Sequence, residues 1–126
     1  MIEQEVVTIG LTQEADDMLE AMVDDGTFAQ KVDGYRFAFS LALAQGAQPG
    51  ELSKRKTIFN VGTVDPDNTL QNIIEELAPE LLTKSSPYRA IERLAEWGVR
   101  ELYQQAIGPG IDFVGLLTEV EEVNGE

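Results

Sequence analysis

The sequence predicts a mainly helical single domain that opens with one short strand and two helices. Before Thr12 the apolar residues alternate with the two-residue period of a strand, and after it they recur at helical spacing. Later in the chain, proline and glycine residues mark where further helices begin and end. A chain of 126 residues, 43% of them hydrophobic, suits one domain. Such a domain buries about two-thirds of the surface that its unfolded chain exposes.

The first segment, EVVTIGLTQEADDMLEAMVDDG at residues 5–26, is expected to form a strand and a capped helix. The side chain of Thr12 is suited to accept a hydrogen bond at the helix start, and Gly26 is suited to follow the helix end. Alternate residues of the strand share the face that is expected to be buried: Val7, Ile9 and Leu11. One face of the helix is also apolar: Ala15, Met18, Leu19, Met22 and Val23.

Residues 33–46, DGYRFAFSLALAQG, predict a second helix that is apolar on nearly every side. A single chain of this length has limited surface with which to enclose such a helix, so we expect it to pack against its twin in a homodimer. A strand followed by two helices, the second of them buried, is similar to the ribbon-helix-helix unit, in which the strands of two copies pair. The predicted dimer interface comprises these residues: Val7, Ile9, Phe37 and Leu41.

The remainder of the chain predicts a helical extension. Three helices are expected there, and each begins at a residue suited to capping: Asp65, Ser86 and Asp112. Pro79 is expected to end or kink the first of them, and Gly108 is expected to end the second. Residues 50–64 are left unassigned, because TIFNVGTV is compatible with a short strand and with an extended loop. The predicted organisation is a single domain at 1–120, made of a dimerisation unit at 1–46 and the helical extension at 57–120, and a flexible tail at 121–126.

The chain is strongly acidic, with 9 Lys and Arg against 23 Asp and Glu and a net charge of -14. This charge opposes the approach of DNA or of an anionic membrane and attracts a basic surface. No apolar run approaches the roughly 20 residues that a membrane span needs, and the N-terminus lacks the features of a signal peptide. We therefore expect a cytoplasmic protein that binds no membrane.

The sequence contains no cysteine and no histidine. Disulfides, thiol catalysis, thiolate zinc sites and imidazole acid-base chemistry are therefore excluded. The acidic runs lack the ligand spacing of a calcium loop, and helix capping is the simpler interpretation of DPDNT at residues 65–69. We expect no catalytic residue, no metal site and no cofactor.

Two groups of charged residues are candidate binding surfaces. The first helix carries an acidic face, suited to a basic protein partner: Glu14, Asp16, Asp17, Glu20 and Asp24. Four basic residues are candidates for contact with nucleic acid: Arg36, Lys54, Arg55 and Lys56. They are few beside the surrounding acids, so any binding to DNA is expected to be weak.

The long helix after Ser86 carries a stripe of arginines interleaved with Glu92 and Glu96. Glu96 and Arg100 are four residues apart, the spacing of a favourable helical ion pair. The stripe is therefore interpreted as a salt-bridged face that points into solvent: Arg89, Arg93 and Arg100. Trp97, on the same helix, is expected to be a core or interface residue.

Three blocks, KVDGYRFAFSLALAQG, KTIFNVGTVDPD and SPYRAIERLAEWGVREL, occur in an order and spacing that resembles the Dnd system-associated family. Its members are small proteins encoded beside bacterial DNA phosphorothioation and related phage-defence genes. The resemblance covers residues 28–118 and implies an accessory or regulatory component of a defence system, with no catalytic residues to carry over. The N-terminal half is also similar to the small ribbon-helix-helix-like subunit of the Dnd modification machinery, which is associated with DNA binding through lysines. Residues 12–25 contain no lysine.

Three functions follow as hypotheses from these patterns. The first is a non-enzymatic accessory protein of a bacterial DNA-modification or defence complex, whose acidic face binds a basic protein. The second is a ribbon-helix-helix-type transcriptional regulator or DNA-binding subunit. The third, a metal-dependent hydrolase that uses carboxylates, has no supporting residue spacing and ranks last.

Overall fold

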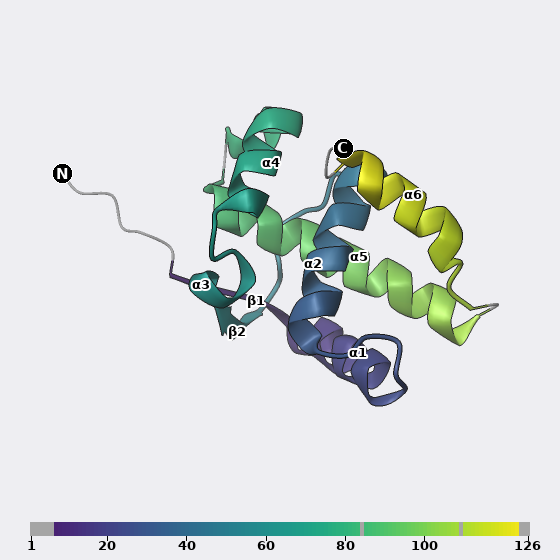
Figure 1. Ribbon diagram of the computed structural model, residues 1–126. Helices are drawn as coiled ribbons and strands as arrows, with labels where there is room; N and C mark the ends of the chain where they lie inside the picture. The colour runs from purple at the N-terminus through teal and green to yellow at the C-terminus, as the bar shows by residue number, and fades with distance from the viewer. Residues whose placement is uncertain (1–6, 84, 109, 124–126) are drawn as a thin grey trace.

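A computed structural model of the chain describes residues 7–83, 85–108 and 110–123. It is mainly helical and has a small two-stranded antiparallel sheet near the N-terminus, so the predicted fold class is confirmed at this level (Figure 1). Its elements in chain order are β1 (Thr8–Thr12), α1 (Gln13–Asp24), α2 (Lys31–Ala44), β2 (Arg55–Asn60), α3 (Val61–Val64), α4 (Thr69–Leu77), the 3-10 helix η1 (Pro79–Leu82), α5 (Pro87–Ile107) and α6 (Phe113–Val123).

Helix α2 lies at the centre of the molecule. Helix α5 crosses it, α6 runs beside it and α1 packs at its N-terminal end (Figure 1). The side chains of Tyr35, Phe39 and Leu41 are fully buried among them. Most of the apolar circumference of this helix is therefore enclosed by its own chain, whereas the sequence led us to expect a second copy. Helix α5, which spans 21 residues, makes the most extensive contact with α2.

The close contact between α2 and α5 depends on a glycine. A Cβ atom placed on Gly98 would overlap the carbonyl oxygen and carbonyl carbon of Ala38, so a side chain of any size must push the two helices apart. Small residues at such a crossing let backbones approach closely, which brings the flanking side chains into tighter packing. Ala38 and Gly98 thus set the distance between the two central helices.

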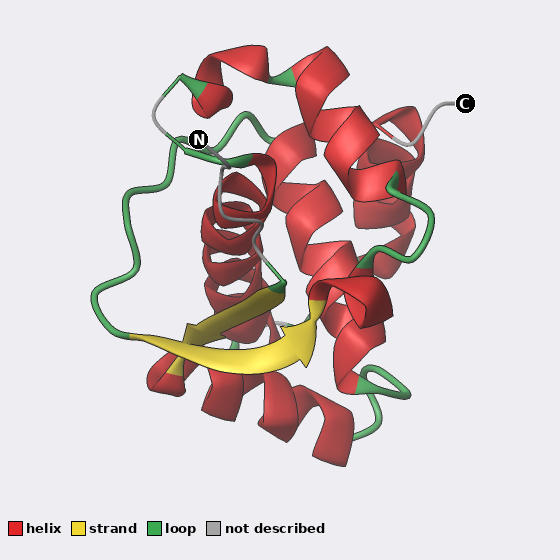
Figure 2. Cartoon of the chain, turned by 90° about the vertical axis from the view of Figure 1, so that its left-hand side faces the viewer, coloured by secondary structure: helices red, strands yellow, loops and turns green. Residues whose placement is uncertain are grey.

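Strand β1 pairs with β2 of the same chain, in a segment that the sequence left unassigned (Figure 2). The register places Ile9 opposite Phe59 and Gly10 opposite Thr57, so β2 has one extra residue and forms a bulge. The bulge brings the carbonyl oxygen of Lys56 so close to Gly10 that no side chain fits there. This steric limit explains why a glycine occupies position 10 of the strand.

Most helix ends lie where the sequence predicts them. The hydroxyl of Thr12 accepts the N–H of Ala15 at 3.2 Å, and Ser86 accepts the N–H of Arg89 at 3.3 Å. Gly26, with φ of 87°, follows the end of α1, and Asp112 accepts the N–H of Gly115 at the start of α6. These caps are confirmed because each depends only on residues within one turn.

Helix α4 begins later than predicted, at Thr69 and not directly after Asp65. Asp65 still supplies the cap, because its buried carboxylate accepts the N–H groups of Leu70 and Gln71 at 2.9 and 3.1 Å. Asn68 adopts a left-handed conformation, with φ of 62°, and this turn separates Asp65 from the helix. The cap residue was thus correctly predicted, but the intervening turn was missed.

At the C-terminus, α6 continues to Val123, so the predicted flexible tail at 121–126 begins too early. Residues 124–126 lie outside the described part of the chain. The buried side chains of Leu116 and Val120 hold α6 against α2. Within the described ranges, no helix is long and apolar enough to cross a membrane.

Candidate functional site

Helix α1 presents four of its predicted acidic residues to solvent: Glu14, Asp17, Glu20 and Asp24. At 100° per residue these positions fall within an arc of about 120°, and they extend over about 15 Å of helix. Glu14 pairs with Arg100 at 3.0 Å and Glu20 lies 3.9 Å from Lys31, but their side chains stay 77% and 60% exposed. Asp17 accepts a hydrogen bond from Gln13 on the same helix. We refer to these four residues as the acidic stripe.

Asp16, the fifth predicted member, points the other way and is 3% exposed. Lys31 of α2 lies 2.6 Å from one of its carboxylate oxygens, and Lys56 of β2 lies 3.0 Å from the other. Burial alone would raise the pKa of Asp16, but the hydrogen bonds and charges of the two lysines outweigh it and lower that pKa below 3.8. Asp16 is therefore a structural ion-pair residue, and the prediction that it belongs to a binding face is wrong.

Three of the four predicted nucleic-acid contacts are engaged inside the chain. Arg36 donates to the carbonyl oxygens of Thr63 and Val64, both at 2.9 Å, which satisfies the end of α3. Arg55 pairs with Glu92 at 2.7 Å, and Lys56 pairs with Asp16. Lys54 is exposed and has no ion pair with another described residue. The structure therefore does not gather these four residues into one basic surface.

Glu92 is buried, although the sequence predicted it on a solvated face. One of its oxygens, Oε2, accepts three hydrogen bonds: from the N–H of Gly10 at 2.8 Å, from Arg55 at 2.7 Å and from Arg89 at 2.9 Å. The side chain thus ties β1 and β2 to α5. Spacing provided a signal, because Glu92 lies three and seven residues before Ala95 and Val99, which are buried on the same face.

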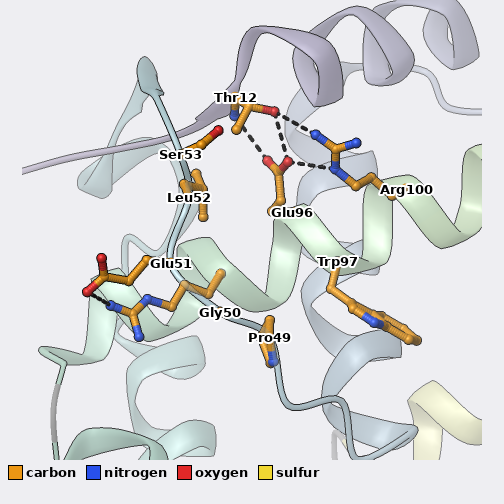
Figure 3. Close-up of a pocket in the computed structure, with 10 residues that line it drawn as sticks. Thr12, Pro49, Gly50, Glu51, Leu52, Ser53, Glu96, Trp97 and Arg100 are labelled. Carbon is orange, nitrogen blue, oxygen red and sulfur yellow. Dashed lines mark hydrogen bonds and ion pairs between the residues drawn. The ribbon is translucent and has the colours of Figure 1, made fainter.

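Glu96 repeats this arrangement one turn along α5 (Figure 3). Its two oxygens accept the N–H of Thr12 at 3.0 Å and the Thr12 hydroxyl at 2.8 Å. Arg100 donates to Glu96 at 2.8 Å, as the i, i+4 spacing predicted. The hydrogen bonds that Arg100 donates to Glu96 and Glu14 also raise the pKa of Arg100. The arginine stripe is salt-bridged as expected, but its carboxylates turn inward to strand β1.

These contacts fill the second edge of β1, the edge that faces away from β2. Gly10 and Thr12 donate their N–H groups to Glu92 and Glu96, and the hydroxyl of Tyr35 donates to the carbonyl of Gly10 at 2.8 Å. Burial of the Tyr35 phenol raises its pKa well above 10.0, so it remains a donor. In a ribbon-helix-helix dimer this edge would be available to the strand of a second copy.

Of the four residues predicted at a dimer interface, Ile9 and Leu41 are fully buried within the single chain. They contribute to its core, so their assignment to an interface with a second copy is corrected. Phe37 is half-buried and lies in an aromatic cluster with Phe28 and Phe113, at ring-centre distances of 6.0 and 5.8 Å. Val7 is 63% exposed, contrary to the expectation that it belongs to the buried face of the strand.

The basic side chains of the described residues are nearly all neutralised within the chain. Six of them form ion pairs with carboxylates: Lys31, Arg55, Lys56, Arg89, Arg93 and Arg100. Because the chain holds 23 acids and 9 basic residues, this pairing leaves most carboxylates without a cation. The acidic stripe is therefore a surface of real negative potential.

In the described segments, no group of three or more acidic side chains is placed so that it could hold a metal ion. No family model, no curated protein and no solved structure matches the chain. The candidate site therefore rests on the charge and the contacts of its own residues.

Proposed function

We propose that this protein is a non-enzymatic interaction protein whose acidic stripe binds a basic surface of a protein partner. The supporting observation is the division of charge: six of the described cations form ion pairs within the chain, while Glu14, Asp17, Glu20 and Asp24 line one side of α1 in solvent. Complementary charge would raise the association rate most at low salt, because ions screen exposed charges. The resemblance to Dnd-associated proteins suggests a partner in a bacterial DNA-modification or phage-defence complex.

The proposal is tested by two variants of equal charge. One replaces Asp17, Glu20 and Asp24 by Asn, Gln and Asn, which leaves the Glu14–Arg100 pair intact and removes only the long Glu20–Lys31 contact of 3.9 Å. The control replaces three acids of α4 and η1 by glutamine: Glu75, Glu76 and Glu80. Both bring the net charge from -14 to -11. Each protein is used to purify partners from the native host, and the binding constant of each recovered partner is then measured at several salt concentrations.

We expect the α1 variant to bind the partner about tenfold or more weakly, because three rim charges of up to about 1 kcal/mol each are removed. The α4 control should bind as the natural protein does. Equal weakening of both variants would show attraction to the net charge alone and would contradict a specific site. Recovery of an acidic partner would contradict the proposal as well.

DNA binding through a paired ribbon is the competing function. The internal contacts of Arg36, Arg55 and Lys56 weigh against it, and so do the carboxylates on the second edge of β1. Titration of duplex DNA at low salt separates the two functions. If the acidic stripe binds a protein partner, the protein should not bind duplex DNA. If the protein is a DNA-binding regulator, its affinity for DNA should fall steeply with salt and should be weakened by Lys54→Ala. Lys54→Ala is the one substitution in the basic run that leaves the described ion pairs intact.

A further inference from the structure

Helix α6 is apolar on two sides, and described residues cover one of them. Leu116 and Val120 are buried against α2, so this side of the helix belongs to the core. On the other side, Val114 is 81% exposed and Leu117 is 45% exposed. Helix α6 runs beside α2 on the outside of the molecule (Figure 1). Two large apolar side chains of one helix therefore face solvent.

The exposed apolar surface of α6 continues onto α2. Leu117 lies three residues after Val114 and four after Phe113, so the three side chains are neighbours on the helix surface. The ring of Phe113 is half-buried, and its centre lies 5.8 Å from the centre of the half-buried Phe37 ring. These four residues form a continuous apolar surface, which we call the α6 patch: Phe37, Phe113, Val114 and Leu117.

The charged residues of α6 and of the chain around it all have one sign. From residue 101 to the last residue, the sequence contains Asp and Glu but no Lys or Arg. Asp112 and Glu121 are exposed, one just before and one just after the apolar residues of α6. Glu121 follows Leu117 by four residues and therefore lies on the same side of the helix. An apolar surface with carboxylates at both ends attracts a partner of positive charge.

We propose that the α6 patch binds a basic amphipathic helix of a partner protein. The apolar face of that helix covers Val114 and Leu117, while lysines or arginines beside this face meet Asp112 and Glu121. A second copy of the chain fits less well, because it brings the same carboxylates and a further net charge of -14 to the contact. The patch on α6 is a different site from the acidic stripe on α1, so each can be tested without the other.

The probe is the peptide LKKLLKLLKKLLKL, whose leucines form one face of a helix and whose lysines flank that face. A fluorescein label on the peptide reports its binding to the full-length protein through fluorescence anisotropy. The matched peptide LEELLELLEELLEL has the same apolar face and the opposite charge. We expect the basic peptide to bind, and the acidic peptide to bind about tenfold or more weakly, because its carboxylates face those of α6.

Two matched leucine variants test whether the peptide lies on α6. Leu117→Asn should weaken binding of the basic peptide about fivefold or more, because the peptide covers the apolar surface of this side chain. Leu77→Asn removes a leucine of α4 that is 53% exposed, and it should leave the binding unchanged. Thermal unfolding of both variants verifies that each protein is folded.

Several outcomes would overturn this inference. The natural protein fails to bind the basic peptide, the two peptides bind equally well, or Leu77→Asn weakens binding as much as Leu117→Asn does. If the variant of Asp17, Glu20 and Asp24 loses the peptide while Leu117→Asn retains it, the peptide binds α1; the inference then fails and the proposed function stands. A doubled mass in light scattering that Leu117→Asn abolishes would show that a second copy covers the α6 patch, which overturns the inference as well.

Discussion

At the scale of single residues, one buried carboxylate joins three elements. Asp16 of α1 holds Lys31 at the start of α2 and Lys56 in β2. A buried charge is costly unless it is paired, so the two lysines keep Asp16 ionised and Asp16 keeps the elements together. The hydrogen bond that Lys56 donates to Asp16 raises the pKa of Lys56 in turn.

The pairing of Asp16 with the two lysines predicts how the stability of the fold depends on pH. Because the pKa of Asp16 is lowered by folding, its contribution is complete above the ordinary value of 3.8 and is lost as the pH falls through the lower folded value. For Asp16→Asn, we expect a lower free energy of unfolding at neutral pH. Below pH 3.8, the free energy of unfolding of this variant should fall less steeply with pH than that of the natural protein. The two slopes can differ by up to about 1.4 kcal/mol per pH unit, the limit for one proton. Urea denaturation at several pH values measures both. Asp24→Asn, an exposed neighbour on the same helix, should retain the natural slope; equal slopes in all three proteins would refute the role of Asp16.

Glu92 provides a second test at this scale. In Glu92→Ala, the N–H of Gly10 and the guanidinium groups of Arg55 and Arg89 lose their shared acceptor. We expect the free energy of unfolding to fall by about 2–4 kcal/mol, the range for a broken buried pair in which the arginines regain some water. Glu101→Ala on the same helix removes only a bond from Gln105 and should cost less than about 1 kcal/mol. Similar losses in the two variants would mean that Glu92 is not a structural anchor.

Sequence reasoning identified the local contacts of such residues and missed the distant ones. The caps at Thr12 and Ser86 were predicted because donor and acceptor lie within one turn. Asp16 could not be distinguished from Asp17, since its burial depends on Lys31 and Lys56, which are far along the chain. The acidic stripe was therefore predicted with one residue too many.

At the scale of elements, the crossing of α2 and α5 limits which residues can replace Gly98. We expect Gly98→Ala to lower the free energy of unfolding by about 1–3 kcal/mol, because the added methyl group overlaps the backbone at Ala38 and forces the helices apart. Gly62→Ala is the control, since its added methyl group meets no atom within 4 Å. It should be neutral or stabilising by up to about 1 kcal/mol. Thermal unfolding of both proteins measures the difference, and a neutral Gly98→Ala would show that the helices are not in close contact there.

The helices were predictable because their periodicity and caps are local, whereas the sheet was not. Residues 55–60 gave no clear pattern, and their partner strand at 8–12 lies far away in the sequence. The bulge at Ile58 also interrupts the alternation that marks a strand. Among the predicted helices, α4 begins late, where a left-handed Asn68 follows Asp65, and α2 begins at Lys31, two residues before the predicted start. The short helices α3 and η1 were not predicted.

At the scale of the whole molecule, the fold predicts its own oligomeric state. We expect light scattering to give the mass of one chain, 13.9 kDa, because α2 is enclosed by its own chain and the second edge of β1 is filled. Val7→Asp should not change that mass, although Val7 is exposed at the start of the strand. A doubled mass that Val7→Asp abolishes, while Val114→Asp preserves it, would contradict this expectation and support a ribbon-helix-helix dimer.

The hydrogen bonds between strand β1 and helix α5 also affect the order in which the chain can fold during translation. The bonds from Gly10 to Glu92 and from Thr12 to Glu96 join residues that are 82 and 84 positions apart. Closing so long a loop costs entropy that only the completed contacts recover. While the chain is being made, β1 can pair with β2, but its second edge must wait until Glu92 and Glu96 of α5 have left the ribosome. The first 46 residues, which the sequence predicts as one unit, would therefore complete their tertiary contacts only late in translation.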